Sequence, residues 1–153
     1  MELLERLSRR QVEAMIAVRR GSIGEKGASL NFIAGELRVR PPSALDHLTV
    51  LERLHLVSRH RGKSRLTPRG ETCLLEYHRH HRVAESLFQQ LGLPAEATHT
   101  AALEVDLALS HRTVDQLCEA EGHPRECPHG DPIPPCGASS GERALHLPKG
   151  VRR

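Results

Sequence analysis

The spacing of apolar and polar positions predicts helices over most of this chain. Residues 3–20 carry apolar side chains at helical spacing, and Gly21 ends the run. A glycine-rich loop follows, and residues 30–37 then place four apolar side chains on one face of a short helix. Ser29 precedes that helix and is a suitable N-cap. The first 40 residues therefore predict two helices joined by a loop.

A tight turn and a hairpin follow these helices. Pro41 and Pro42 break the second helix, because neither has an N–H to donate, and a third helix is predicted at about residues 43–54. Residues 56–60 and 64–66 are short strand candidates around a turn that contains glycine. The order helix, helix, turn, helix, hairpin is typical of a winged helix-turn-helix.

The second half of the chain predicts helices only. Thr67 and Pro68 resemble an N-cap and a first helical residue, so a long helix is expected from Pro68 to about Leu91. Residues 96–109 and 111–121 are predicted as two further helices, and prolines dominate the sequence after them. The predicted fold class is therefore mainly α. We expect a winged helix-turn-helix at residues 1–72, an all-helical domain at 73–136 and a flexible tail at 137–153.

Charge is also unevenly distributed along the chain. Residues 1–82 carry 16 Lys and Arg against 9 Asp and Glu, a formal charge of +7. Residues 83–136 carry 2 against 9, a formal charge of −7. The basic half suits a polyanion and the acidic half suits cations. No run of eighteen apolar residues and no apolar signal core is present, so we expect a cytoplasmic protein with no membrane partner.

The basic half carries the candidate DNA contacts. In a winged helix-turn-helix the helix after the turn enters the major groove of double-stranded DNA, and the hairpin lies against phosphates. The candidates on these two elements are Ser43, Asp46, His47, Arg59, Arg61, Lys63 and Arg65. Basic side chains at the hairpin would release counterions from the DNA backbone. The alternative for the hairpin is a solvated edge that prevents aggregation.

The second half of the chain contains candidate metal ligands. His81 and Glu85 are four residues apart on the long helix, so both side chains lie on one face and could hold one divalent ion. A hydrogen bond between them is the alternative. Cys127 and His129, in a proline-rich loop, could ligate a metal through sulfur and nitrogen. These residues favour a site for a divalent transition metal.

Together these motifs resemble the iron-dependent repressor family. The long helix holds the sequence HRVAE at 81–85, LGL follows at 91–93, and CPHGDPIP stands at 127–134. The resemblance covers about residues 8–135 and is specific in combination. It implies a homodimer that represses transcription when Fe²⁺ or Mn²⁺ binds, and a metal-binding and dimerisation role for the helical half. We expect the dimer to bind a palindromic operator. The positions that align with the family's operator contacts are Arg40, Pro42, Ser43 and Asp46.

The resemblance implies two metal sites in each subunit, of which one is complete here. His81, Glu85 and His99 align with the ligands of the ancillary site. These nitrogen and oxygen donors suit Mn²⁺ or Fe²⁺, whereas adding Cys127 would favour Fe²⁺, Co²⁺ or Zn²⁺.

The primary site of the family is degraded. Arg10 aligns with its N-terminal ligand, and Leu103 and Leu107 align with two more. Asp106 and the nearby Glu13 are the positions that keep a carboxylate. A cation at Arg10 would repel a divalent metal there.

Two functions stay open on these residues. The favoured one is a metal-dependent, DNA-binding repressor of metal homeostasis genes. The alternative is a regulator or metal-binding protein that has lost the primary site and is metal-independent or responds to cysteine oxidation. An enzyme is not expected, because the sequence shows no nucleophile–base pair and no glycine-rich phosphate loop. Cys118, Cys127 and Cys136 are spaced by nine residues, match no zinc motif, and are interpreted as a coincidence.

Overall fold

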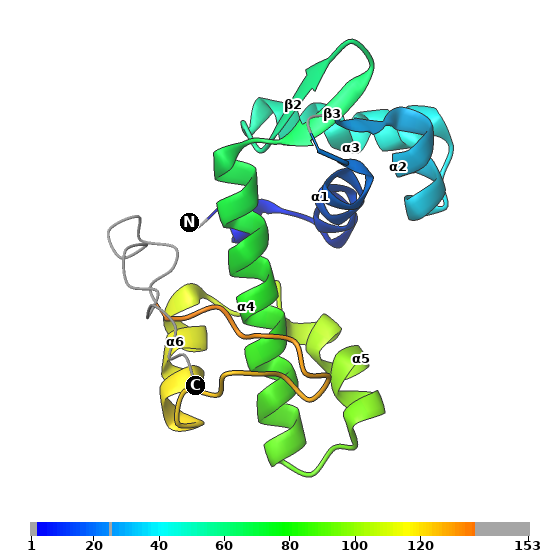
Figure 1. Ribbon diagram of the computed structural model, residues 1–153. Helices are drawn as coiled ribbons and strands as arrows, with labels where there is room; N and C mark the ends of the chain where they lie inside the picture. The colour runs from blue at the N-terminus through cyan, green and yellow to red at the C-terminus, as the bar shows by residue number, and fades with distance from the viewer. Residues whose placement is uncertain (1–2, 25, 137–153) are drawn as a thin grey trace, which may run out of the picture.

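The computed structural model describes residues 3–24 and 26–136, and its elements gather at the two ends of one long helix, α4 (Figure 1). The elements at the first end are η1 (Leu4–Arg6), α1 (Arg9–Gly21), β1 (Ala28–Ser29), α2 (Leu30–Leu37), α3 (Pro41–Arg53), β2 (Val57–His60) and β3 (Lys63–Leu66). Next come α4 (Pro68–Gln90), α5 (Ala95–Val105) and α6 (His111–Ala120). The arrangement is mainly helical, with a winged helix-turn-helix ahead of an all-helical part, so the predicted fold class is confirmed.

The first helix begins later than the apolar pattern predicted. Residues 4–6 form a single 3₁₀ turn, and α1 starts at Arg9 because Ser8 is extended and caps it. The Ser8 hydroxyl accepts from the Gln11 N–H at 3.3 Å, and the Gln11 side chain accepts from the Ser8 N–H at 2.8 Å. This reciprocal capping box fixes the register of every side chain on α1.

The third helix starts two residues earlier than predicted. Pro41 occupies its first position, where the missing N–H has no intrahelical partner in any case and the fixed φ suits the helix.

The hairpin of β2 and β3 matches the prediction, and its turn has Arg61 and Gly62 at φ 48° and 73°. The sequence pattern missed β1, a two-residue strand that pairs with β3. A strand this short has no readable alternation.

Two apolar cores meet along α4. The core of the winged helix extends to Tyr77 on α4, and the second core begins at Val83, one and a half turns later. The predicted domain boundary at residues 72 and 73 therefore lies inside a continuous helix, and the division into domains stays a prediction. The predicted tail at 137–153 lies outside the described residues. No helix in the described part of the chain is long and apolar enough to cross a membrane.

Candidate functional site

Three predicted ligands meet where α4 passes α5. His81 and Glu85 project from adjacent turns of α4, and His99 projects from α5. The His81 Nε2 atom lies 3.0 Å from Glu85 Oε1 and 2.9 Å from His99 Nδ1, and the third side of the triangle is 3.0 Å. His81 and Glu85 are buried, whereas His99 is exposed. A solute can therefore reach the triangle from the His99 side.

Hydrogen bonds alone do not satisfy this triangle. Each neutral imidazole offers one proton on one nitrogen, and the ionised carboxylate offers none. A proton on His81 Nε2 or on His99 Nδ1 can point along one edge, so at least one edge brings together two lone pairs or two N–H groups. A single cation near the centre of the triangle would accept a lone pair from all three atoms. The donor set therefore fits a divalent metal.

The lengths of the triangle's edges are compatible with an octahedral metal site. In an octahedral site with metal–ligand bonds of about 2.1 Å, neighbouring ligand atoms lie about 3.0 Å apart, against about 3.4 Å in a tetrahedral site. The observed edges of 2.9–3.0 Å match one octahedral face. Two imidazoles and one carboxylate on a face, with open positions opposite, are typical of Fe²⁺ sites.

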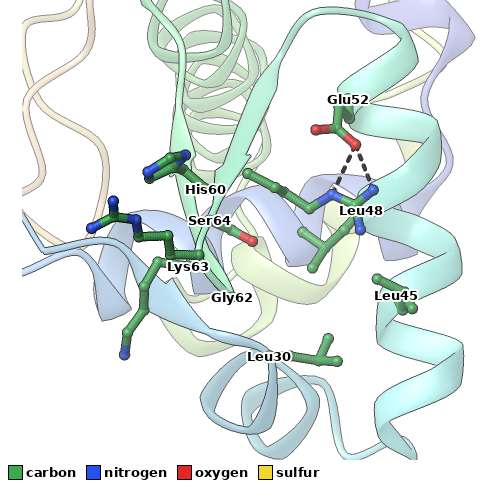
Figure 2. A pocket seen from close by; sticks show the side chains of 10 residues that line it. Leu30, Leu45, Leu48, Glu52, His60, Gly62, Lys63 and Ser64 are labelled. Atoms are coloured by element: carbon green, nitrogen blue, oxygen red, sulfur yellow. Dashed lines mark hydrogen bonds and ion pairs between the residues drawn. The ribbon is translucent and has the colours of Figure 1, made fainter.

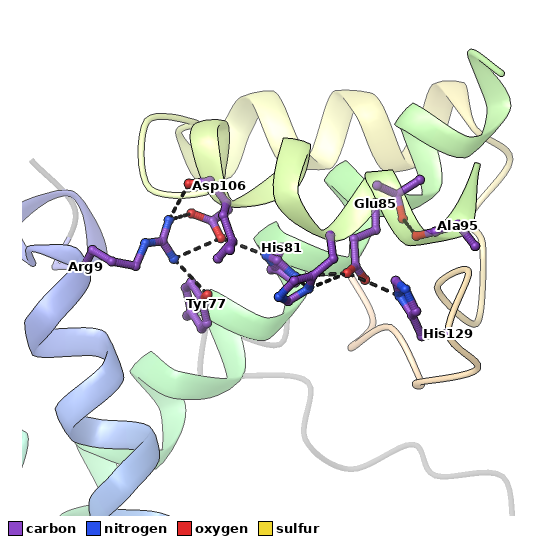
Figure 3. Close-up of polar contacts among 10 residues, drawn as sticks. Arg9, Tyr77, His81, Glu85, Ala95, Asp106 and His129 are labelled. Atoms are coloured by element: carbon purple, nitrogen blue, oxygen red, sulfur yellow. Dashed lines mark hydrogen bonds and ion pairs between the residues drawn. The ribbon is translucent and has the colours of Figure 1, made fainter. Parts of the chain in front are cut away.

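The loop after α6 brings two further candidate metal ligands, Cys127 and His129, close to the Glu85 carboxylate. His129 Nδ1 lies 3.3 Å from Glu85 Oε1, and the ligand atoms of Glu85, Cys127 and His129 all lie within 4.8 Å of one another. The structure thus brings together five of the predicted metal ligands, with Glu85 shared by both groups. Figure 3 shows three of them, His81, Glu85 and His129.

Asp106 stands behind His81 rather than in the triangle. Its Oδ2 atom accepts from His81 Nδ1 at 2.8 Å, so the Nε2 atom of that ring is directed at Glu85 and His99. The other oxygen of Asp106 pairs with Arg9 at the start of α1. A carboxylate behind a histidine fixes its tautomer and strengthens it as a ligand. Asp106, predicted as a metal ligand, is placed here as a positioning residue.

The charges of this cluster shift two pKa values strongly. Burial alone would lower the pKa of His81, but hydrogen bonds to Asp106 and Glu85 outweigh burial and raise this pKa to about 9. Burial would raise the pKa of Glu85, yet hydrogen bonds from His81, Cys127 and His99 lower it to about 2. Without a metal, the triangle therefore holds a carboxylate and an imidazolium at neutral pH.

The cation predicted at Arg10 lies one residue earlier. The Arg9 guanidinium contacts Asp106, donates to the Leu103 carbonyl oxygen at 2.6 Å and donates to the Tyr77 hydroxyl at 2.9 Å (Figure 3). Arg10 instead pairs with Glu13 at 3.0 Å, so the structure does not bring Glu13 to the metal cluster. The guanidinium thus occupies the space among residues that align with the degraded primary site.

The candidate DNA contacts lie at the opposite end of α4. Arg40, Pro42, Ser43 and Asp46 are exposed on and before α3, and His47 is half-buried. Arg61, Lys63 and Arg65 are exposed on the hairpin.

Arg59 differs from the other basic residues of the hairpin. Its Nε atom donates to Glu52 of α3 at 2.8 Å, along a hollow that Leu45 and Leu48 help to line (Figure 2). The guanidinium therefore fastens the hairpin to α3. Sequence reasoning missed this role because it depends on two elements packing together.

Comparison with known proteins shows which family this part of the chain resembles. Residues 67–135 match the family model described as the metal-binding and dimerisation domain of iron-dependent repressors. Residues 67–135 are therefore similar to the corresponding domain of the iron-dependent repressors. The match covers α4, α5, α6 and the loop after them, and therefore every residue of the triangle. Among curated proteins, none matches the chain.

Solved structures extend the likeness to the winged helix. A hypothetical protein from Sulfolobus solfataricus shares 28% identity with a TM-score of 0.79, over 84% of this chain and 99% of that one. IdeR of T. acidophilum shares 28% identity with a TM-score of 0.63, over 84% and 60%. A manganese-dependent transcriptional repressor in complex with manganese shares 27% identity with a TM-score of 0.68, over 82% and 58%. The chain thus spans about three-fifths of the length of the two repressors, and the relatives with a named function are regulators rather than enzymes.

Proposed function

We propose that this protein is a metal-dependent transcriptional repressor that binds a palindromic operator as a homodimer. The observation that carries the proposal is the triangle of His81, Glu85 and His99, whose edges suit one six-coordinate divalent ion. Mn²⁺ or Fe²⁺ is the expected ion, because both accept nitrogen and oxygen donors in such a geometry. Bound there, the ion supplies positive charge and fixes the positions of α4 and α5.

The DNA-contacting surface is proposed to be α3 and the hairpin. Exposed Arg61, Lys63 and Arg65 supply positive charge for the phosphates. Ser43 and Asp46 lie exposed near the start of α3, where a recognition helix approaches base edges. Arg59, held by Glu52, would keep the hairpin aligned with α3.

A chain of polar contacts connects the two ends. His81 contacts Asp106, and Asp106 contacts Arg9 at the first turn of α1. When His81 becomes a ligand, it gives up its Nε2 proton and loses its positive charge, while Asp106 keeps its charge and its bond to Arg9. The balance of charge at α1 therefore depends on whether a metal is bound. Through these contacts, metal binding could change the position of α1 in the winged helix.

Metal-dependent DNA binding tests the proposal. Duplexes selected from a random library with Mn²⁺ present should bind the purified protein tightly with Mn²⁺ and at least about tenfold more weakly with a chelator, a coupling of roughly 1.4 kcal/mol. Glu85→Gln removes the shared ligand charge and should abolish the Mn²⁺ effect. Glu104→Gln, an exposed carboxylate of α5 outside the triangle, is the matched control and should retain it.

The outcomes are distinct. Equal DNA affinity with Mn²⁺, with Fe²⁺ and with chelator would show a metal-independent regulator. Mn²⁺ binding that survives Glu85→Gln undiminished would place the metal outside the triangle. Absence of any duplex selected above background would remove DNA as the partner.

A further inference from the structure

A second group of donor atoms forms between α6 and the end of the described chain. The Sγ atoms of Cys118 and Cys136 lie 3.5 Å apart. His123 Nδ1 lies 3.7 Å from the first sulfur and 3.6 Å from the second. None of these residues belongs to the triangle or to the Glu85, Cys127 and His129 group. The nine-residue cysteine spacing has no role in this arrangement, because Cys127 lies at the other cluster.

These distances match a tetrahedral zinc site. With Zn–S bonds of about 2.3 Å and Zn–N bonds of about 2.0–2.1 Å, tetrahedral angles put two sulfurs about 3.8 Å apart and a sulfur and a nitrogen about 3.6 Å apart. The observed sulfur–nitrogen distances of 3.7 and 3.6 Å agree with the second value, and the observed sulfur–sulfur distance of 3.5 Å is shorter than the first. A disulfide would instead need the sulfurs to close to about 2.05 Å. The edges of the first triangle, 2.9–3.0 Å, are shorter and suit a six-coordinate ion.

The backbone is bent to aim His123 at Cys118. Gly122 and His123 both adopt left-handed conformations, with φ of 77° and 56°, immediately after α6. The His123 N–H donates to the Cys118 carbonyl oxygen at 2.8 Å, which closes the turn. Such a turn is a common way to end a helix, and here it brings His123 back toward Cys118.

The loop that carries Cys136 is held in place by a backbone hydrogen bond, a buried side chain and two prolines. The Ile133 N–H donates to the Arg125 carbonyl oxygen at 2.8 Å, and the Ile133 side chain packs in the second core beside Cys118. Pro134 and Pro135 then restrict the backbone up to Cys136. The thiol therefore arrives at α6 along a segment with little conformational freedom.

Arg79 supports the thiol from α4. Its Nη2 atom donates to Cys136 Sγ at 3.0 Å and pairs with Asp115 at 2.7 Å, and its side chain is almost completely buried. Two thiolates neutralise one divalent cation, and the Arg79–Asp115 pair is neutral by itself. The local charge therefore balances with a divalent metal present. A guanidinium that donates to a ligating sulfur is an outer-shell contact of the kind that orients metal ligands.

We propose that Cys118, His123 and Cys136 form a thiolate site for Zn²⁺, separate from the metal-sensing triangle. The site offers two sulfurs and one nitrogen, and its fourth position is open to water or another donor, since Cys136 is exposed. The bound ion ties the loop of residues 122–136 to α6. Because the same loop carries Cys127 and His129 to Glu85, zinc here holds those donors in place. The inference does not depend on the proposed function.

Cobalt substitution tests the site directly. The full chain, purified under reducing conditions and stripped of metal, is titrated with Co²⁺, a zinc probe whose bonds to thiolate give near-ultraviolet charge-transfer absorption. One Co²⁺ per chain should produce this absorption, and one equivalent of Zn²⁺ should abolish it. Cys136→Ser and Cys118→Ser each leave one thiolate, so each should lose at least about half of the absorption and weaken Zn²⁺ binding by more than the roughly 10-fold that loss of an outer-shell partner costs. Cys127→Ser and Glu85→Gln, which change the other cluster, should keep it.

Other outcomes overturn the proposal. Absorption that is lost in Cys127→Ser but kept in Cys136→Ser would place the thiolate metal beside Glu85. Reduced wild-type protein that gives no charge-transfer absorption would show that the three donors hold no metal. A Cys118–Cys136 disulfide found by mass spectrometry under the same conditions would assign the pair to redox chemistry. Cys136 is exposed, so its variant keeps the test valid even if replacing the buried Cys118 prevents folding. Retained Mn²⁺ binding in Cys136→Ser separates failure here from failure of the proposed function.

Discussion

At the scale of single residues, local spacing predicted what lies on one helix and failed for what lies between helices. His81 and Glu85 follow from a four-residue spacing on a strong helix, and the structure brings them together. The contact between Arg9 and Asp106 joins residues 97 positions apart, which no local pattern reveals. The family resemblance pointed to Arg10, whereas the structure places Arg9 beside Asp106. A shift of one residue turns a side chain by about 100° around a helix.

The raised pKa of His81 makes metal binding depend on pH. Without metal, His81 titrates at about 9, so at neutral pH a proton occupies the Nε2 atom that a metal requires. Mn²⁺ affinity should therefore rise about tenfold per pH unit between roughly pH 7 and 8.5, and should level off above pH 9 as competition ends. Calorimetry in buffers of different ionisation enthalpy should count about one proton released per Mn²⁺ at pH 7.

A contrary result would be equally clear. If Mn²⁺ affinity is flat from pH 7 upward and falls only below about pH 6.5, His81 has the pKa of an ordinary histidine. The hydrogen bonds to Asp106 and Glu85 would then not stabilise the imidazolium. Mn²⁺ is the appropriate probe, because it binds thiolates weakly and avoids protons released from Cys118 and Cys136.

At the scale of elements, the sequence pattern predicted which segments form helices but not how the elements pack against one another. The ends of α4 were predicted closely, because Thr67 caps it with a 3.0 Å bond to the Gly70 N–H and Pro68 opens it. Nothing in the local pattern of residues accounts for a glycine at position 70. In the structure, a Cβ at Gly70 would lie 2.0 Å from the Leu56 carbonyl oxygen, where the hairpin leaves α3. This close approach of two backbones sets how the wing meets the long helix.

Gly70→Ala should therefore destabilise the protein. The clash is with a backbone atom that cannot rotate away, so we expect a loss of about 1–3 kcal/mol in the free energy of unfolding, measured by urea denaturation. Gly35→Ala is the matched control, because Gly35 lies in α2 with open space around its Cβ position. That change should stabilise the protein by roughly 0.5–1 kcal/mol. Equal effects of the two changes would mean that α4 and the hairpin separate readily.

At the scale of the whole molecule, the division of charge agrees with the division of structure. Residues 1–82, with a formal charge of +7, contain the winged helix, and residues 83–136, with a formal charge of −7, contain every donor of the two clusters except His81. Figure 1 shows the hairpin at one end of α4 and α5 and α6 at the other. Composition could indicate this division of charge, but it could not show that the donor residues form two separate clusters. The partners His123 and Cys136 reach α6 only through the turn and loop that follow it.

This polarity leads to a prediction for DNA binding. If the hairpin lies on the phosphate backbone, Arg61→Ala and Lys63→Ala should each weaken binding to all duplexes alike. Each should also flatten the dependence of log affinity on log salt concentration by about 0.9 per lost phosphate contact. Arg112→Ala is the matched control, because it removes one exposed positive charge from α6 in the acidic half and should leave the slope unchanged.

Arg59→Ala should differ from both the hairpin variants and the control. Loss of the contact with Glu52 frees the hairpin from α3, so binding to preferred sequences should weaken more than binding to random ones. If Arg61→Ala and Arg112→Ala change the slope equally, the protein's net charge attracts DNA without a defined contact. The hairpin would then be only a basic, solvated edge of the sheet.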